Sequence, residues 1–195
     1  IEAMNSPNFP VEYLDDYSPG EIPLWLTETL LHSEQVDPDD AGAALAWTLD
    51  LTSEERLLPL LTQGTAHANL AVRFWAVTAL GEMGETAKPA LPLLLDTLMN
   101  EPASSLTSAE VEESNRVRGA AAFALARIGA EPERCVSVLT RMLQHRSVEI
   151  WAHAALGLGL FGKDASRAIP VLAETLGRAD DRQTSVSTRH PAATA

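Results

Sequence analysis

Two histidines and a glutamate near residue 150 are spaced in a way that could hold a metal ion. His145, Glu149 and His153 follow one another at intervals of four, which places them along one flank of a helix. Two imidazoles and a carboxylate are an acceptable ligand set for zinc. However, the helix is expected to begin near Ser147, so His145 would lie in the preceding turn. We therefore predict that this chain has no metal site.

A single cysteine is the other residue that could do chemistry. Cys135 stands alone, which excludes an intrachain disulfide and a cysteine-based metal cluster. It takes the place of Ala90 and Ala168 in the repeat analysed below, so we expect a buried core residue and not a nucleophile. The sequence also has no glycine-rich phosphate loop and no serine nucleophile elbow. These observations predict no catalytic residue and no cofactor.

Charge is distributed unevenly along the chain. The chain has 27 acidic and 14 basic residues, a net charge of −13, and residues 1–64 hold 13 of the acids but only one base, a net charge of −12. Asp37, Asp39 and Asp40 form the densest acidic cluster, which could dock a basic protein partner. The alternative is a solvated cap that keeps an open end of the array soluble. Such acidity disfavours nucleic acid, and no apolar run reaches the roughly 18 residues that span a membrane.

The elements that must position these residues follow from an internal repeat. Residues 67–98 align without a gap on residues 145–176, at an offset of 78, and a third copy lies at an offset of 45. Of the 32 aligned pairs, 11 are identical, and the shared residues are His67, Ala76, Leu80, Gly81, Gly84, Ala87, Ala90, Pro92, Leu94, Thr97 and Leu98. The basic step is about 33 residues, the length of one helical hairpin.

The pattern of apolar residues and glycines predicts two helices in each repeat unit. Apolar residues at i, i+4, i+7, i+8 and i+11 form one stripe on the first helix. Glycine then ends this helix in each copy, at Gly84, Gly129 and Gly162, since glycine accepts the left-handed conformation of a C-terminal cap. The second helices are expected at residues 88–99, 134–144 and 165–176. Two upstream helices are expected at residues 23–31 and 37–49, and another after Thr52.

The predicted fold is all-α, a right-handed α-α superhelix of about four hairpins plus a leading helix. We expect an irregular arm at residues 1–20, one repeat array at residues 21–178, and a disordered tail at residues 179–195. The array contains an insertion at residues 100–115. Thr107 and Glu110 suggest a capping box there, which favours one long helix from Ser108 to Ile128. The alternative is a loose loop with a new helix near Asn115.

The segments Val72–Gly84 and Val117–Gly129 resemble the bacterial HEAT repeat, including the type named after phycobilisome lyases. The resemblance covers about residues 38–178. The usual acid before Val-Arg is Asn69 or Asn115 here, and the Arg is Trp151 in the last unit. The resemblance implies an α-solenoid but no single function. HEAT-repeat hydroxylases hold a metal pair with His-Glu dipeptides, and this sequence contains none.

Three hypotheses for function follow. The first is a non-catalytic scaffold, in which the second helices line an inner surface that binds a protein or peptide. The second is the helical accessory region of a larger bacterial enzyme. The third is a lyase or hydroxylase-like enzyme in its own right. We expect the tryptophans to lie in the core or to line a groove, where an exposed one would anchor a partner; they are Trp25, Trp47, Trp75 and Trp151.

Overall fold

The computed structural model describes residues 54–177, and these residues form helices with no strand among them. The prediction of an all-helical fold is thus confirmed for this part of the chain. The helices expected at residues 23–31 and 37–49, the arm and the tail lie outside the described residues. The elements are α3 (Glu54–Gly64), α4 (Leu70–Glu82), η3 (Gly84–Ala90), α5 (Leu91–Met99), α6 (Ser108–Ile128), α7 (Pro132–Met142), α8 (Val148–Phe161), η4 (Gly162–Ala168) and a final helical stretch at residues 169–177.

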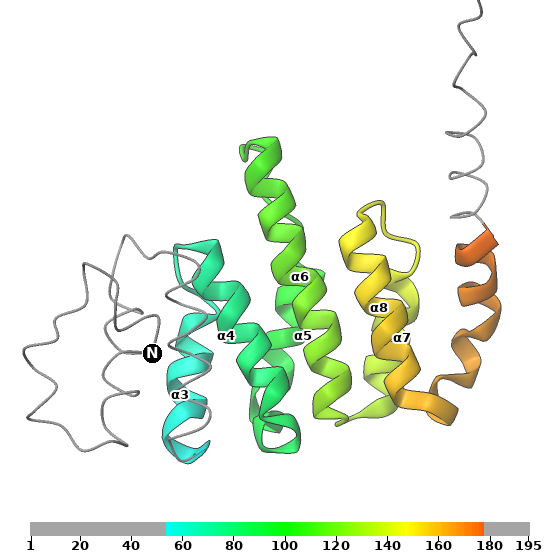
Figure 1. Ribbon diagram of the computed structural model, residues 1–195, viewed down its shortest axis with the longest axis horizontal. Helices are drawn as coiled ribbons and strands as arrows, with labels where there is room; N and C mark the ends of the chain where they lie inside the picture. Colours follow the sequence, from blue (N-terminus) through cyan, green and yellow to red (C-terminus); the bar gives the residue numbers. More distant parts are fainter. Residues whose placement is uncertain (1–53, 178–195) are drawn as a thin grey trace, which may run out of the picture.

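The helices stack in two layers along one direction (Figure 1). The first helices of the repeat units, α4, α6 and α8, form one layer, in which α6 packs against both of its neighbours. The second helices form the other layer, and each packs most extensively on the first helix that follows it in the chain: α3 on α4, α5 on α6 and α7 on α8. This arrangement is an α-solenoid. No helix in residues 54–177 is long and apolar enough to cross a membrane.

The predicted ends of the first helices are confirmed. Gly129 is the C-cap of α6 in the left-handed conformation, with φ of 66°. Gly84 and Gly162 follow α4 and α8 and also have positive φ, 58° and 54°. A residue with a Cβ would be strained at such a φ, so glycine makes the sharp turn from the first helix to the second possible.

The second helices begin later than the sequence predicted in two of the three units. Residues 84–90 and 162–168 are 3-10 helices, and α-helical geometry starts only at Leu91 and Ile169. Each 3-10 segment follows a positive-φ glycine directly, and its tighter coil brings the chain back against the first helix within a few residues. In the middle unit, α7 starts at Pro132, two residues before the expected boundary. Pro132 suits this position because the first turn of a helix has no partner for its N–H.

The long helix predicted across the insertion is confirmed. Helix α6 starts at Ser108, and its N-terminal turns extend beyond α4 and α8 (Figure 1). The capping box is also present, because the Thr107 hydroxyl accepts from the Glu110 N–H at 3.3 Å and the Glu110 carboxylate accepts from the Thr107 N–H at 2.8 Å. These two bonds satisfy N–H groups that a helix start otherwise leaves unpaired.

Leucine and alanine fill the interior between the two layers. The largest fully buried side chains are leucines from successive helices, together with Ile150 and Val72. Alanines occupy the places where first helices meet, and Ala121 in the middle of α6 is completely buried. Small residues here allow the helix axes to approach closely, which fixes the spacing between repeat units.

Candidate interaction site

An open groove lies on the second-helix side of the molecule, between α7 and η4. Its volume is about 490 Å³. Helix α7 supplies one wall because its polar residues lie opposite the apolar face that packs on α8, and η4 supplies the other wall. The groove is lined by Pro132, Glu133, Val136, Ser137, Thr140, Asp164 and Arg167.

The residues that line this groove are suited to binding a peptide segment and not to catalysing a reaction. Ser137 and Thr140 offer hydroxyl groups to a partner's backbone, and Arg167 offers a planar donor that suits a carboxylate. The Thr140 hydroxyl also donates to the Val136 carbonyl at 2.7 Å, so it reaches the groove mainly as an acceptor. No histidine or cysteine lines the groove. The arrangement can bind an extended segment but brings together no nucleophile and base.

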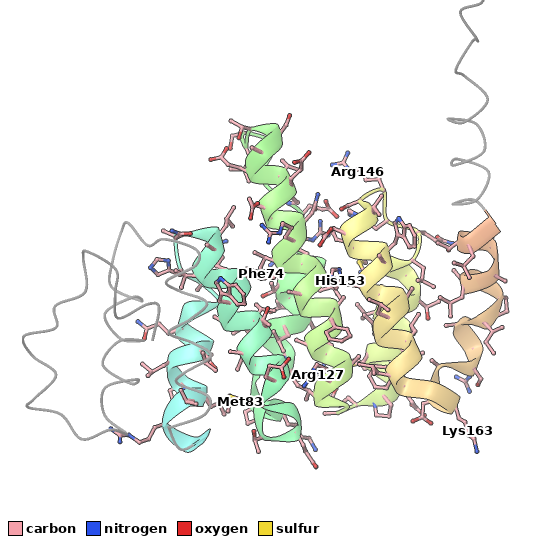
Figure 2. The ribbon with its side chains drawn as sticks, viewed as in Figure 1. Phe74, Met83, Arg127, Arg146, His153 and Lys163 are labelled. Atoms are coloured by element: carbon pink, nitrogen blue, oxygen red, sulfur yellow. The ribbon has the colours of Figure 1, made fainter. Side chains whose placement is uncertain are left out.

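The first-helix layer is joined on its outer side by pairs of exposed or half-buried residues. Figure 2 shows Phe74, Arg127 and His153 on this side, one on each of α4, α6 and α8. The Arg127 guanidinium forms an ion pair with Glu82 at 2.7 Å and donates to a carbonyl of α4. The Arg116 guanidinium stands 5.0 Å from the centre of the Phe74 ring. Each such surface pair contributes roughly 0.2–1 kcal/mol. These pairs therefore help to position the first helices relative to one another more than they stabilise the fold.

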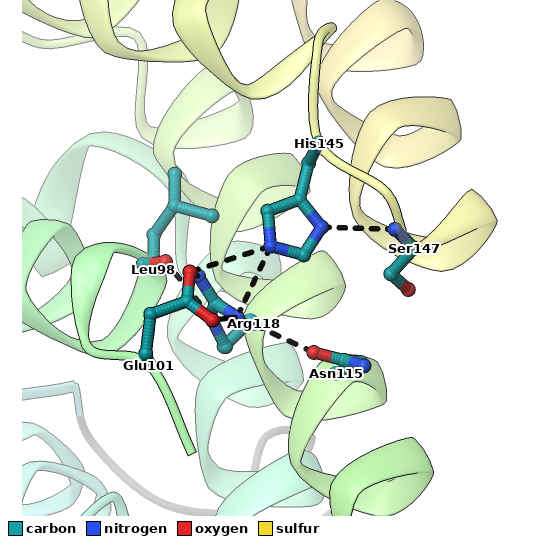
Figure 3. A network of polar contacts seen from close by, with 6 residues as sticks. All are labelled: Leu98, Glu101, Asn115, Arg118, His145 and Ser147. Atoms are coloured by element: carbon teal, nitrogen blue, oxygen red, sulfur yellow. Dashed lines mark hydrogen bonds and ion pairs between the residues drawn. The ribbon is translucent and has the colours of Figure 1, made fainter.

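A polar cluster centred on Arg118 connects three segments of the chain (Figure 3). Arg118 is buried on α6, and its Nε donates to the Leu98 carbonyl at the end of α5 at 3.0 Å. The same guanidinium pairs with the Glu101 carboxylate, at 2.8 Å, and donates to the Asn115 side chain at 3.3 Å. The hydrogen bond from Arg118 lowers the pKa of Glu101 below its usual value. A buried guanidinium is tolerated here because its donors have partners.

His145 completes this cluster from the turn before α8. Its Nδ1 accepts from the Ser147 N–H at 3.0 Å, as His67 Nδ1 does from the Asn69 N–H one double repeat earlier. Because Nδ1 accepts this bond, Nε2 is the nitrogen that can donate, and it lies 3.4 Å from the Glu101 carboxylate. The cluster therefore fastens the segment after α5 to the turn before α8. Sequence reasoning missed the partnership because Glu101 lies in the insertion, 44 residues from His145, outside any periodic pattern.

The three residues considered as metal ligands do not converge. His145 lies in the turn before α8, as expected, and turns toward Glu101. His153 directs Nδ1 at the Glu149 backbone carbonyl, 2.7 Å away, while the nearer carboxylate oxygen of Glu149 is at 3.9 Å. Within residues 54–177, no group of three or more histidine, cysteine or acidic side chains is placed to hold a metal ion.

Cys135 is buried, as the repeat register predicted. Its side chain has no exposed surface, and the thiol donates to the Ala130 carbonyl at 3.3 Å. Burial is the main cause that raises the pKa of this thiol to about 11. A thiol in this state is a poor nucleophile because almost none of it is ionised near neutral pH.

The remaining sequence candidates divide between described and undescribed residues. Trp75 and Trp151 are half-buried, and the Trp75 ring stands edge-on to Phe74 with ring centres 5.2 Å apart. The acidic cluster of Asp37, Asp39 and Asp40 lies outside the described residues, as do Trp25 and Trp47.

The stacked hairpins place the molecule in the class of α-solenoid proteins. A family model described as HEAT repeats matches residues 25–114 and again residues 103–188, and the chain belongs to the HEAT-repeat family. HEAT repeats generally serve as protein-interaction scaffolds. None of the curated proteins compared with the chain matches it.

Proposed function

We propose that this chain is a non-catalytic scaffold that binds a protein or peptide partner in the groove between α7 and η4. The observation that carries the proposal is the groove itself, which is open, large enough for several side chains, and lined by hydroxyl, carboxylate and guanidinium groups. It lies on the second-helix side of the array, where repeat scaffolds offer long surfaces to a partner. A bound peptide would satisfy its backbone groups on Ser137 and Thr140 and place an acidic side chain near Arg167.

Site-specific photo-crosslinking tests this assignment. A photoreactive amino acid replaces Ser137 in the groove, and a matched variant carries it at Ala68, an exposed position between α3 and α4. A partner that crosslinks from Ser137 and not from Ala68 supports the groove. Binding of that partner is then measured by calorimetry with Thr140→Arg, which fills the groove, and Thr86→Arg, which adds the same side chain at an exposed site in η3. Equal binding by these two variants would contradict the groove assignment.

A second proposed contact is the acidic cluster of Asp37, Asp39 and Asp40, which would attract a basic surface of the partner. The support is the charge distribution, since residues 1–64 carry a net charge of −12. Exposed charges interact over about 10 Å at 0.1 M salt, so association should slow as salt rises. Replacing the three aspartates by asparagine should have the same effect as salt. Neutralising the exposed Glu85, Asp96 and Glu112 instead is the control. Association rates that respond to neither salt nor the aspartate variant would leave solubility as the role of these acids.

Two alternative functions have weaker support. As the accessory region of a larger bacterial enzyme, the array would use the same groove on its own catalytic part, and the full reading frame around this sequence distinguishes this case. A lyase or hydroxylase-like enzyme of the phycobilisome-lyase type would need residues beyond those that the groove contains. Metal analysis of the purified protein together with a bilin-binding assay addresses this third function.

A further inference from the structure

Two apolar positions of the second helix are buried in the units of α5 and α7 but exposed in the last unit. One position is occupied by Leu91 and Val136, which are 1% and 6% exposed, but by Ile169 in the last unit, which is 62% exposed. The other holds Leu98 and Leu143, at 0% and 1%, but Leu176 at 61%. The residue types are alike in all three units, so only the neighbours differ. In these two units the following first helix packs on the second helix, α6 on α5 and α8 on α7.

The first helices repeat a second contact that also remains open at this end. A methyl group placed on Gly81 of α4 would lie 3.0 Å from Cα and Cβ of Ala124 on α6. One unit later the same positions are Ala126 on α6 and Gly157 on α8, and a methyl group on Gly157 would lie 3.2 Å from the Ala126 Cβ. The next equivalent is Gly159 on α8, where an added Cβ would meet no atom within 4 Å. Among the described residues, Gly159 therefore has the contact surface of a repeat interface but no neighbouring helix packed on it.

The surface around Gly159 is strongly apolar. Leu156 and Leu160 of α8 are 60% and 55% exposed, and they lie on the helix that also carries Ala152 and Ala155. Together with Ile169 and Leu176 they form what we term the C-terminal face. The outer face of a terminal repeat is normally polar, because a bare repeat interface promotes association. Since the C-terminal face resembles an internal interface, it requires an apolar partner.

The composition of residues 178–195 and the distribution of charge bear on which partner covers the C-terminal face. Residues 178–195 contain only one large apolar residue, Val186, and cannot replace the leucine-rich helix that covers each internal unit. The charged groups of residues 145–177 balance, with Arg146, Lys163 and Arg167 against Glu149, Asp164 and Glu174. The net charge of −12 lies in residues 1–64, and α3, which is the described part of that segment, stands at the opposite end of the array from residues 169–177 (Figure 1). Contact between two C-terminal faces thus adds little charge repulsion.

We propose that the C-terminal face binds the C-terminal face of a second copy of this chain, so that the two arrays join about a two-fold axis. The face is self-complementary, because α8 offers both the large side chains and the small residues that a repeat interface needs. Closed two-fold pairs are the commonest protein assemblies, since each copy buries the same surface. The small stripe of α8, made of Ala152, Ala155 and Gly159, allows the two α8 helices to approach as closely as α4 and α6 do.

Sedimentation velocity of the full chain over a concentration series tests this proposal. The wild-type chain should show the mass of a dimer that dissociates on dilution. Ile169→Glu and Leu156→Glu should each raise the dissociation constant at least tenfold, and both positions are exposed enough for the fold to persist, which circular dichroism and thermal melting verify. Met99→Glu is the matched control, because Met99 is an exposed apolar residue of α5 outside the C-terminal face. This variant should dimerise like the wild type.

Three results would overturn the proposal. A wild-type chain that stays monomeric at every concentration excludes the second copy as the partner. A monomer that dimerises only after deletion of residues 178–195 shows that this segment covers the face. A dimer that persists in Ile169→Glu and Leu156→Glu, or is lost equally in Met99→Glu, shows that the contact lies elsewhere.

Discussion

Arg118 and Glu101 form a two-point ion pair between a buried and an exposed side chain. The guanidinium Nη2 lies 2.8 Å from one carboxylate oxygen, and Nη1 donates to the other at 3.3 Å. The Arg118 side chain is 3% exposed, whereas that of Glu101 is 60% exposed. The guanidinium is therefore shielded from solvent, and Glu101 balances its charge while the Leu98 carbonyl and the Asn115 side chain accept further hydrogen bonds from it.

Arg118→Ala should lower the free energy of unfolding by about 2–3 kcal/mol, because it removes a buried stem and leaves the Leu98 carbonyl without its donor. Arg116→Ala, two residues earlier on α6 at an exposed ion pair with Glu113, should cost less than about 1 kcal/mol. Denaturant titrations of both variants give the comparison. Equal losses would mean that the Arg118 cluster adds nothing beyond a surface pair.

The Glu101 pair should make stability depend on pH in the acid range. The hydrogen bond from Arg118 lowers the pKa of Glu101 in the folded state, so its contribution is fully present above the unfolded pKa of about 4.5 and is lost as the pH falls through the folded pKa. The difference in unfolding free energy between wild type and Glu101→Gln should therefore be constant near neutral pH and shrink in acid. Because other carboxylates, such as Glu110, are present in both proteins, their contributions cancel when the unfolding free energy of the variant is subtracted from that of the wild type. A difference that grows in acid would contradict the assignment.

One substitution at two equivalent positions of the repeat should have opposite effects. Gly81→Ala places a methyl group 3.0 Å from the backbone of Ala124 and should destabilise by about 1–3 kcal/mol. Gly159→Ala meets no atom and should stabilise α8 by roughly 0.5–1 kcal/mol, since alanine is the better helix former. Thermal melting at low protein concentration, where the chain is monomeric, measures both. Destabilisation by Gly159→Ala under these conditions would show that another segment packs there within one chain.

Ala121→Asp should destabilise the array by about 3 kcal/mol or more, because it buries a carboxylate without a partner at a completely buried position. Ala109→Asp is the matched control, since Ala109 is exposed in the first turn of α6, where an acid is favourable. A melting temperature unchanged by Ala121→Asp would disagree with the packing of α6 between α4 and α8.

Features that depend on near neighbours in the chain were predictable from the sequence. The 3.6-residue apolar stripe, the glycines after each first helix and the Thr107–Glu110 capping box act over about four residues, so they determine where helices begin and end. The repeat register likewise predicted the burial of Cys135, because equivalent positions in stacked units meet equivalent surroundings. The expected start of α8 near Ser147 also placed His145 in the preceding turn. This was the reason to predict that His145, Glu149 and His153 do not form a metal site.

Tertiary structure alone decided which side chains meet and which remain exposed. Leu91 and Ile169 are both aliphatic and have the same place in the repeat, yet within residues 54–177 only Leu91 is covered, because burial depends on which other helices pack against a residue. The Arg118 cluster and the groove between α7 and η4 likewise join segments whose separation along the chain carries no periodic signal. Helix boundaries depend on residues a few positions apart, so the sequence alone determined them. Packing between helices depends on their positions in three dimensions, so only the tertiary structure decided it.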